Sequence, residues 1–314
     1  MSPDRDVVLV RGGESDRLIA RLHSAYPGLG VLSNGDVNAR PEEITIVAGK
    51  VYDEELDEMP ALDWVHSWAA GVEGDVGPAL RRSGITVTSS AGNGAIPLAE
   101  HAMMLALMLN RDARRWLAAQ DDHRWERFSH AELHGKTMGI YGFGNVGREL
   151  AARAKAFGMR VVALRRDPSR DTELVDEMFG PDGILDFAAR CDVLVVTAAR
   201  TTETEGAIDA AALAALKPDA HLIVVSRGGI VADADLLAAL RSGSLAAAGL
   251  DAHAVEPLPA DSPYWSLPNV IVTPHNGATT SSTASRGTEI FLANLHRRLS
   301  SRPLLNRVDV SALA

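Results

Sequence analysis

The sequence predicts an α/β fold built on parallel sheets, and two observations support that prediction. Short apolar runs rich in β-branched residues alternate with longer stretches of helical period rich in Ala, Leu and Arg, the pattern that builds parallel sheets through helical crossovers. The chain has 314 residues, of which 46% are hydrophobic. This is enough for about two domains of roughly 150 residues each, so we expect two α/β domains with real cores.

The first part of the chain predicts a small flavodoxin-like sheet. Its apolar runs are short and bounded by turn residues, and stretches of helical period separate them. The expected strands are Val7–Val10, Ile44–Ala48, Trp64–Ser67 and Thr86–Ser89, and the expected helices are Leu18–His23 and Val76–Arg82.

A helix that is apolar nearly all round follows, from Ile96 to Asn110. Such a helix must be buried, so we expect it at a domain or subunit junction. The segment Arg111–His134 that comes next is charged and carries Trp116 and Trp125.

The remaining chain predicts a complete doubly wound sheet of the Rossmann type. The expected strands are Thr137–Tyr141, Arg160–Leu164, Val193–Thr197, His221–Val225, Ala246–Leu250 and Val270–Thr273, and the expected helices are Arg148–Phe157, Ala210–Leu216 and Ala234–Arg241. The final helix, Ser285–Leu299, is amphipathic and follows the last strand, so we expect it to return to the first domain. We therefore assign residues 1–98 and 285–314 to one domain and 99–284 to the other.

Charge and composition disfavour several classes of function. With 31 Lys and Arg against 41 Asp and Glu, the formal net charge is −10, which repels a phosphate backbone, so we expect no nucleic acid partner. The longest apolar run, Ala102–Leu109, falls far short of the roughly 20 residues that span a bilayer. The single cysteine, Cys191, lies in an apolar stretch, which indicates a buried structural thiol. With no apolar signal core at its start, the chain is expected to be cytoplasmic, without a membrane.

His66, His101 and His296 lack partners at metal-ligand spacing, so we expect no metal site.

A glycine-rich loop between an expected strand, Thr137–Tyr141, and an expected helix, Arg148–Phe157, indicates dinucleotide binding. In this context the first glycine permits a tight turn, the second lets backbone N–H groups approach a pyrophosphate, and the third lets helix pack on strand. The loop is Gly142, Phe143, Gly144, Asn145, Val146 and Gly147.

The end of the second strand of this domain indicates NADP(H) as the preferred cofactor, with NAD(H) possible. An NAD site usually has an acidic residue about 20 residues beyond the loop, which binds the ribose 2′-hydroxyl group. Here Arg165 lies 18 residues after Gly147 and Arg166 follows it, and two guanidiniums can bind a 2′-phosphate. The alternatives are two solvated arginines and Asp167, 20 residues after Gly147, in the role of the acid.

Three further loops should meet at the carboxyl edge of the second sheet, where open α/β sheets bind ligands. They carry an arginine, Arg227, a carboxylate, Glu256, and a histidine, His275. Together these supply what hydride transfer to a keto acid needs: a cation for the carboxylate, a proton donor for the oxygen, and an acid that keeps that donor protonated.

These residues resemble the D-isomer-specific 2-hydroxyacid dehydrogenase family, over nearly the whole chain. The matching segments are 141–147, Val224–Val231, Gly249–Asp251 with Glu256–Leu258, Pro268–His275, Ala91–His101 and the loop Ser67–Glu73. Departures are Glu73 for the usual Asp, Ala199-Arg200 for a common Pro-Leu, and His253 for an aromatic residue.

The resemblance implies a role for each residue. Arg227 would bind the substrate carboxylate and polarise the keto oxygen, His275 would exchange the proton, and Glu256 would favour its protonated form. Backbone N–H groups at Ala70 and Gly71 would complete the substrate site, which assigns the first domain to substrate and the second to the dinucleotide. Cofactor contacts are implied for Ala198, Ser226, Asp251 and Gly277 as well as for the glycine loop.

The resemblance leaves the substrate and some alternatives open. A small 2-keto acid or D-2-hydroxy acid such as glyoxylate or hydroxypyruvate is expected, in a homodimer formed through the apolar helix. One alternative is an enzyme resembling phosphoglycerate dehydrogenase, which we rank lower because no regulatory domain is expected after Ala314 and the substrate half is not notably basic. The other is a dinucleotide-sensing interaction protein similar to corepressors of this fold.

Overall fold

The chain divides into two compact units in the computed structural model. The structure describes residues 6–12, 15–36, 40–169 and 173–312. Unit 1 comprises residues 1–94 and 280–314, and unit 2 comprises residues 95–279. The boundaries expected after residues 98 and 284 both lie inside helices, α3 (Ala95–Asn110) and α9 (Ser281–Leu299). They are a few residues late because the apolar pattern marks the buried face of a helix better than its first turn.

Unit 1 holds a parallel five-stranded sheet in the order β2-β1-β3-β4-β5, which is the flavodoxin-like order. The strands are β1 (Val7–Val10), β2 (Gly30–Ser33), β3 (Ile46–Ala48), β4 (Trp64–Ser67) and β5 (Thr86–Ser89). Its helices are α1 (Ser15–Ala25), α2 (Pro78–Arg82) and α9, with the short 3-10 helices η2 (Pro41–Glu43), η3 (Asp53–Glu58) and η6 (Val310–Ala312). β2 is a strand that the sequence analysis did not predict.

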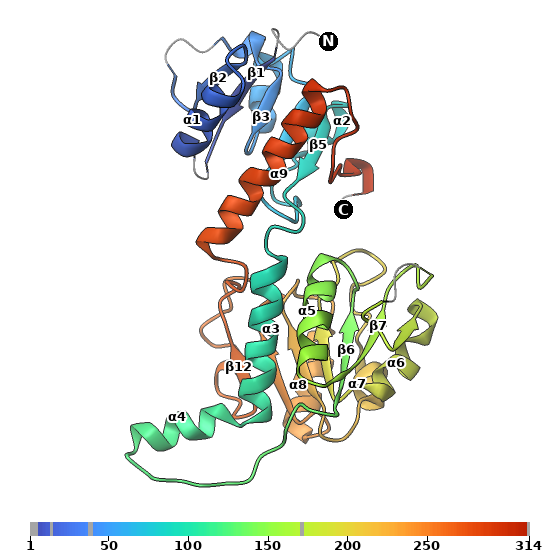
Figure 1. The fold of residues 1–314 in the computed structure, drawn as a ribbon. Helices are drawn as coiled ribbons and strands as arrows, with labels where there is room; N and C mark the ends of the chain where they lie inside the picture. Colours follow the sequence, from blue (N-terminus) through green and yellow to red (C-terminus); the bar gives the residue numbers. More distant parts are fainter. Residues whose placement is uncertain (1–5, 13–14, 37–39, 170–172, 313–314) are drawn as a thin grey trace. The chain divides into compact units, whose positions relative to one another are not determined.

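Unit 2 holds a parallel seven-stranded sheet in the order β12-β11-β10-β9-β6-β7-β8, the doubly wound arrangement expected (Figure 1). The strands are β6 (Thr137–Tyr141), β7 (Arg160–Leu164), β8 (Glu177–Phe179), β9 (Val193–Val196), β10 (His221–Val224), β11 (Ala247–Leu250) and β12 (Val270–Val272). The helices are α3, α4 (Ala113–Asp121), α5 (Asn145–Ala156), α6 (Ile184–Arg190), α7 (Ala210–Ala215) and α8 (Asp233–Ser242), with η4 (Pro181–Gly183) and η5 (Pro263–Trp265). β8, α4 and α6 were not predicted.

Each sheet buries both faces, because alternate side chains of a strand point to opposite sides. In β1, Val8 and Val10 pack with residues of α1 and α9, whereas Leu9 packs with residues of α2 on the other face. In unit 2, one face of the sheet is covered by α3 and α5 and the other by α6, α7 and α8 (Figure 1). Cys191 is fully buried beside α6, as expected for a structural thiol, and burial raises its pKa to about 12.

Candidate active site

The glycine loop opens α5 directly after β6, as the sequence predicts. Gly142 has φ 100°, and a side chain there would collide with the backbone of Ala198. A Cβ on Gly147 would lie 2.7 Å from the carbonyl oxygen of Gly142. A Cβ on Gly144, in contrast, would meet nothing within 4 Å. Two glycines are therefore required by packing, and the middle one leaves open space before the helix N-terminus, which suits close approach of a pyrophosphate.

The loop after β9 closes on the glycine loop. The Thr197 hydroxyl donates to the carbonyl oxygen of Gly142 at 2.5 Å, and the Thr197 N–H donates to Tyr141 O at 2.9 Å. β6 and β9 are neighbours where the strand order reverses, which is the point at which such sheets bind dinucleotides. Ala198 therefore lies beside the glycine loop.

The two arginines after β7 have different surroundings. Arg165 is partly buried, and its Nη1 has no hydrogen-bond partner among the described residues. Arg166 is exposed and pairs with Glu203 at 3.0 Å. The carboxylate of Asp167 accepts hydrogen bonds from the N–H and the hydroxyl of Ser169, at 3.2 and 2.6 Å. An unpartnered guanidinium nitrogen at the end of the second strand suits a phosphate group.

The loop after β10 contacts the loop after β11, which in turn contacts the loop after β12. Gly228, next to Arg227, packs so closely on the backbone of His253 that a Cβ there would collide with it. Arg227 and His253 also line the same small cavity, and Arg227 Nη1 donates to Ser226 O at 2.8 Å. The Ser226 hydroxyl is buried without a partner among the described residues.

Glu256 and His275 form the pair that the sequence predicts. His275 Nδ1 lies 2.7 Å from Glu256 Oε2 and 2.9 Å from Oε1, and each side chain is 36% exposed. The N–H of His253 donates to Glu256 Oε1 at 2.8 Å. Burial acts to raise the pKa of Glu256, but the hydrogen bonds from the His253 N–H and from His275 outweigh it and lower the pKa. The carboxylate is therefore ionised at neutral pH, and Nε2 is the ring nitrogen of His275 left for a substrate.

Asp251, at the carboxyl end of β11, is fully buried and lies behind this pair. Its carboxylate accepts hydrogen bonds from the Thr273 hydroxyl at 2.6 Å and from the N–H groups of Asn276 and Gly277 at 3.2 and 3.0 Å. Burial would raise the pKa of Asp251, but hydrogen bonds from His101, Thr273 and Gly277 prevail and hold it well below the usual range.

The substrate loop that the sequence predicts belongs to unit 1. Ala70 and Gly71 follow β4, and Ala70 is exposed. The preceding turn is fixed by hydrogen bonds from the Ser90 N–H to Ala69 O at 3.0 Å and from Asn93 Nδ2 to Trp68 O at 3.1 Å.

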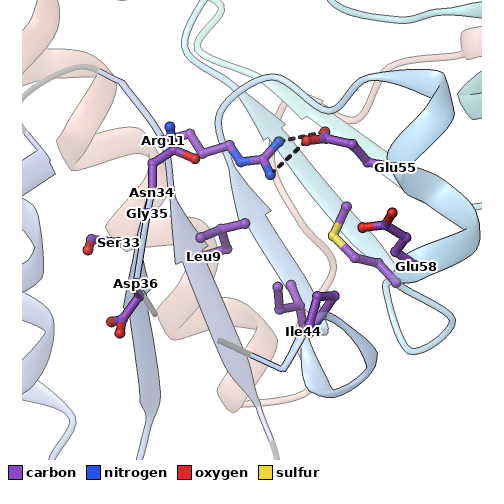
Figure 2. Close-up of a pocket in the computed structure, with 11 residues that line it drawn as sticks. Leu9, Arg11, Ser33, Asn34, Gly35, Asp36, Ile44, Glu55 and Glu58 are labelled. Carbon is purple, nitrogen blue, oxygen red and sulfur yellow. Dashed lines mark hydrogen bonds and ion pairs between the residues drawn. The ribbon is translucent and has the colours of Figure 1, made fainter. Parts of the chain in front are cut away.

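Unit 1 also contains a cavity of about 120 Å³ near the carboxyl ends of β1 and β2 (Figure 2). Its one arginine, Arg11, is held by Glu55 through two hydrogen bonds of 2.7 and 3.1 Å. Asp36 and Glu58 make the remainder of its charged lining acidic. No residue described as lining this cavity is one that the sequence predicts for the site.

The described residues contain neither a candidate metal centre nor a candidate membrane span. No group of three or more His, Cys, Asp or Glu side chains in this part of the chain is arranged to hold a metal ion. No helix among the same residues is long and apolar enough to cross a membrane.

Comparison with known proteins identifies the family. Residues 103–277 match the model of the D-isomer specific 2-hydroxyacid dehydrogenase, NAD binding domain. The chain belongs to this family. The dehydrogenase fold extends over the rest of the chain as well: a family member from Aeromonas salmonicida has a TM-score of 0.86 at 29% identity, covering 98% of this chain and 99% of that one.

Two relatives of this chain carry more specific names. An NADPH-dependent glyoxylate/hydroxypyruvate reductase from Sinorhizobium meliloti, in complex with NADP and sulfate, has a TM-score of 0.83 at 30% identity, covering 98% of this chain and all of that one. A D-3-phosphoglycerate dehydrogenase from Mycobacterium tuberculosis is 35% identical over 92% of this chain and 50% of its own length. The chain thus spans about half the length of the curated relatives it matches.

The sequence analysis missed three groups that shape the site: His101, Thr273 and the N–H of His253. The sequence excludes His101 only as a metal ligand, but its Nε2 lies 3.0 Å from Thr273 Oγ1 and 3.4 Å from Asp251 Oδ1. The signal in the sequence is a histidine in a largely apolar helix. The ring of His253 lies 3.1 Å from Thr273 O, and its N–H donates to Glu256 Oε1.

Proposed function

We propose that this dehydrogenase reduces a small 2-keto acid, such as glyoxylate or hydroxypyruvate, to the D-2-hydroxy acid with NADPH. The observation that carries the proposal is the hydrogen bond between His275 and Glu256 at the carboxyl edge of the nucleotide-binding sheet. A histidine paired with a carboxylate is the usual proton donor for a developing hydroxyl group. The arginine that follows β10, Arg227, supplies a cation in the neighbouring loop.

Each residue has a separate task in this reaction. A reduced nicotinamide, when bound, supplies a hydride to the keto carbon. Arg227 binds the substrate carboxylate and polarises the keto oxygen, which draws the electron pair of the C=O bond onto oxygen. His275 then donates its Nε2 proton to that oxygen, and Glu256 stabilises the protonated ring beforehand through Nδ1. In the oxidation direction His275 takes the proton back.

The substrate carboxylate is also assigned to the N–H groups of Ala70 and Gly71. Two backbone donors on an exposed turn suit an anion. The turn is held by Ser90 and Asn93, which supports a loop that keeps its shape while it binds.

The preferred cofactor in this proposal is NADP(H), with NAD(H) as the weaker one. Arg165 supports this preference, because its Nη1 is buried without a partner among the described residues. Asp167 is engaged with Ser169, which disfavours the alternative in which it takes the acidic role. Glu203 beside Arg166 acts against the preference, so Arg165 carries the greater share of 2′-phosphate binding. Gly142 to Gly147, Ala198, Ser226, Asp251 and Gly277 complete the proposed cofactor site.

Oxidation of D-3-phosphoglycerate is the second candidate. It is favoured by the curated relatives, since the protein from Mycobacterium tuberculosis with that name is 35% identical over 92% of this chain. The S. meliloti reductase, covered over its whole length, favours the first candidate. Both reactions use the same pair of Glu256 and His275 and differ only in the distal group of the substrate.

The direct test is the initial rate of NADPH or NADH consumption by the purified chain with glyoxylate, hydroxypyruvate, pyruvate and phenylpyruvate, beside NAD(P)⁺ reduction with D-3-phosphoglycerate. We expect the highest kcat/KM for NADPH with glyoxylate or hydroxypyruvate. Turnover of D-3-phosphoglycerate alone would establish the second candidate. Cofactor binding without turnover of any of these acids would contradict both and favour a dinucleotide sensor.

We also propose a homodimer located in the cytoplasm. Several large apolar side chains on α3, on α4 and just after it support a second copy as partner. They are Met104, Trp116, Leu117 and Trp125, the last 94% exposed. Light scattering should give twice the 33.4 kDa of one chain, and a mass of one chain would contradict the dimer. The single, buried Cys191 is compatible with a reducing compartment, which cell fractionation can check.

A further inference from the structure

A second pair of histidine and carboxylate, His101 and Asp251, contacts the loop that carries His275, and the proposed proton transfer does not use it. His101 belongs to α3, and its side chain is 13% exposed, whereas Asp251 is fully buried. Neither side chain is exposed enough to exchange a proton with a substrate, whereas His275 is. The pair must therefore be explained by what it holds in place.

The hydrogen bonds of the Thr273 hydroxyl show which group donates between His101 and Thr273. The Thr273 hydroxyl has one proton, and its oxygen lies 2.6 Å from Asp251 Oδ1. Because an ionised carboxylate only accepts, that proton points to Asp251. His101 Nε2, 3.0 Å from the same hydroxyl oxygen and 3.4 Å from Asp251 Oδ1, must then be the donor. Donor and acceptor matching thus assigns a proton to Nε2 of His101.

The groups held by Asp251 are the two peptide N–H groups that follow His275. They belong to Asn276 and Gly277 and donate to the two carboxylate oxygens at 3.2 and 3.0 Å. His275 itself has φ 53°, a left-handed conformation that costs a non-glycine residue roughly 1 kcal/mol or more. Such a conformation persists only where the surroundings enforce it.

The residues around the hydrogen bonds of Asp251 are closely packed. A Cβ on Gly277 would lie 2.8 Å from Asp251 Oδ2 and 3.1 Å from Cγ of His101. On its other side the loop is fixed by His253, whose Nε2 lies 3.1 Å from Thr273 O. The chain also passes between the two units at 94/95, seven residues before His101, and at 279/280, two residues after Gly277. Both passages thus adjoin the network along the chain.

We propose that His101 is a positioning residue: through Thr273 and Asp251 it holds the loop 273–277 in the conformation that presents His275 to the substrate. The inference rests on the proposed function only where it assigns proton transfer to His275. His101 acts by fixing Asp251, and Asp251 acts by fixing the backbone on the carboxyl side of His275.

The test compares variants that lose or keep the donor. His101→Leu removes it, whereas the side-chain amide of His101→Gln can place an N–H close to the position of Nε2–H. Thr273→Val keeps the shape of threonine and loses the hydroxyl, and it replaces His101→Leu should that protein not fold. Glu100→Gln, on an exposed residue of the same helix next to His101, is the matched control.

Two readouts are measured on the full chain: kcat with the best 2-keto acid beside the Kd of NADPH, and the ring ¹H–¹⁵N spectrum of His275. For His101→Leu we expect kcat to fall about tenfold or more, as for loss of a hydrogen bond to a charged group, with the Kd of NADPH changed less than about threefold and the His275 signals shifted. His101→Gln should restore both readouts. Because His101 and Thr273 act as one unit, the two losses should not add in the double variant.

Two outcomes would overturn the inference. One is a His101→Leu protein with wild-type kcat and wild-type His275 signals. The other is a His101→Gln protein as impaired as His101→Leu, since the N–H would then not be what matters. A wild-type protein that turns over no acid would contradict the proposed function alone, and the His275 spectra would still decide the role of His101.

Discussion

Each unit has a histidine in or after a strand of its sheet, His66 within β4 of unit 1 and His275 after β12 of unit 2, and the surroundings of the two are opposite. His275 is 36% exposed and bonded to a carboxylate. His66 is fully buried; its ring nitrogens lie 2.8 and 3.1 Å from the hydroxyl groups of Thr88 and Ser90. No carboxylate is described as a hydrogen-bond partner of His66.

The difference shows that its surroundings decide whether a histidine suits proton transfer or supports the fold. His275 remains in contact with solvent and with the carboxylate of Glu256. Burial among Trp64, Trp68 and Phe291 penalises the charge on His66 and lowers its pKa to about 4. A ring that is neutral at physiological pH suits a sheet core, where it joins β4 to β5. The following predictions test this contrast, beginning with the largest effect.

His275→Gln should lower kcat by about 10²- to 10⁴-fold, the usual contribution of a general acid. The reason is that glutamine keeps a similar shape and cannot deliver a proton. Steady-state rates and the Kd of NADPH measure the effect, and the Kd should stay within about threefold because the glycine loop is untouched. A variant with wild-type kcat would remove His275 from the reaction.

The equivalent change in unit 1, His66→Gln, should alter the pH dependence of stability rather than the chemistry. A histidine whose folded pKa is about 4 and whose unfolded pKa is about 6.5 is protonated first in the unfolded chain. Stability therefore falls as the pH drops below about 6.5, by about 2 kcal/mol at pH 5.

Urea unfolding at pH 7.5 and pH 5 measures this difference. His66→Gln should lose about 2 kcal/mol less than the wild type between the two pH values. His296→Gln, which changes an exposed histidine of α9, is the control and should behave as the wild type does. Equal pH dependence in wild type and His66→Gln would contradict the buried, neutral state.

The sequence predicted interior strands better than edge strands, for a physical reason. The interior strands β1, β4, β6 and β7 have the predicted boundaries, since strands buried on both faces form largely apolar runs, and among the edge strands β5 has them too. The two missed strands, β2 and β8, are both at the edge of a sheet and only partly buried, and an edge strand needs no such run. Short α4 and α6 were missed because their apolar faces are small: Ala119 is the buried residue of α4.

Within the site, contiguous motifs could be predicted and distant contacts could not. Gly142–Gly147 is a local pattern, and the pairing of Glu256 with His275 follows from parallel strand ends meeting at one edge. The contact between His101 and Thr273 joins residues 172 positions apart. It depends on how α3 lies on the sheet, which no spacing in the chain encodes.

Glu256→Gln sharpens the contrast by removing the charge while keeping a hydrogen-bonding side chain. We expect kcat to fall about tenfold, since the protonated form of His275 loses its carboxylate partner. The wild type should show a matching loss in acid. The pKa of Glu256 is lowered in the folded protein, so the carboxylate is still charged at its ordinary pKa of about 4.3, and kcat is lost only as the pH falls further, through the lowered pKa.

The pH profile of kcat, extended down to about pH 3, measures this effect. Glu256→Gln should lack the acidic limb that belongs to the carboxylate. Asp261→Asn, on an exposed acid of the loop before η5, is the control. An unchanged profile in Glu256→Gln would mean that His275 acts without its carboxylate.

The smallest effect is expected for the adjacent residues Arg165 and Arg166. They too differ in burial and in ion pairing. Arg165→Gln should raise the KM for NADPH about fivefold and leave that for NADH nearly unchanged, because a charged hydrogen-bond donor to the 2′-phosphate is lost. Arg166→Gln should have a smaller effect, since Arg166 is 78% exposed and already paired with Glu203, and exposed ion pairs contribute little. Initial rates with both cofactors give the two ratios. Equal changes for NADPH and NADH in Arg165→Gln would show that the arginine holds the loop and does not read the phosphate.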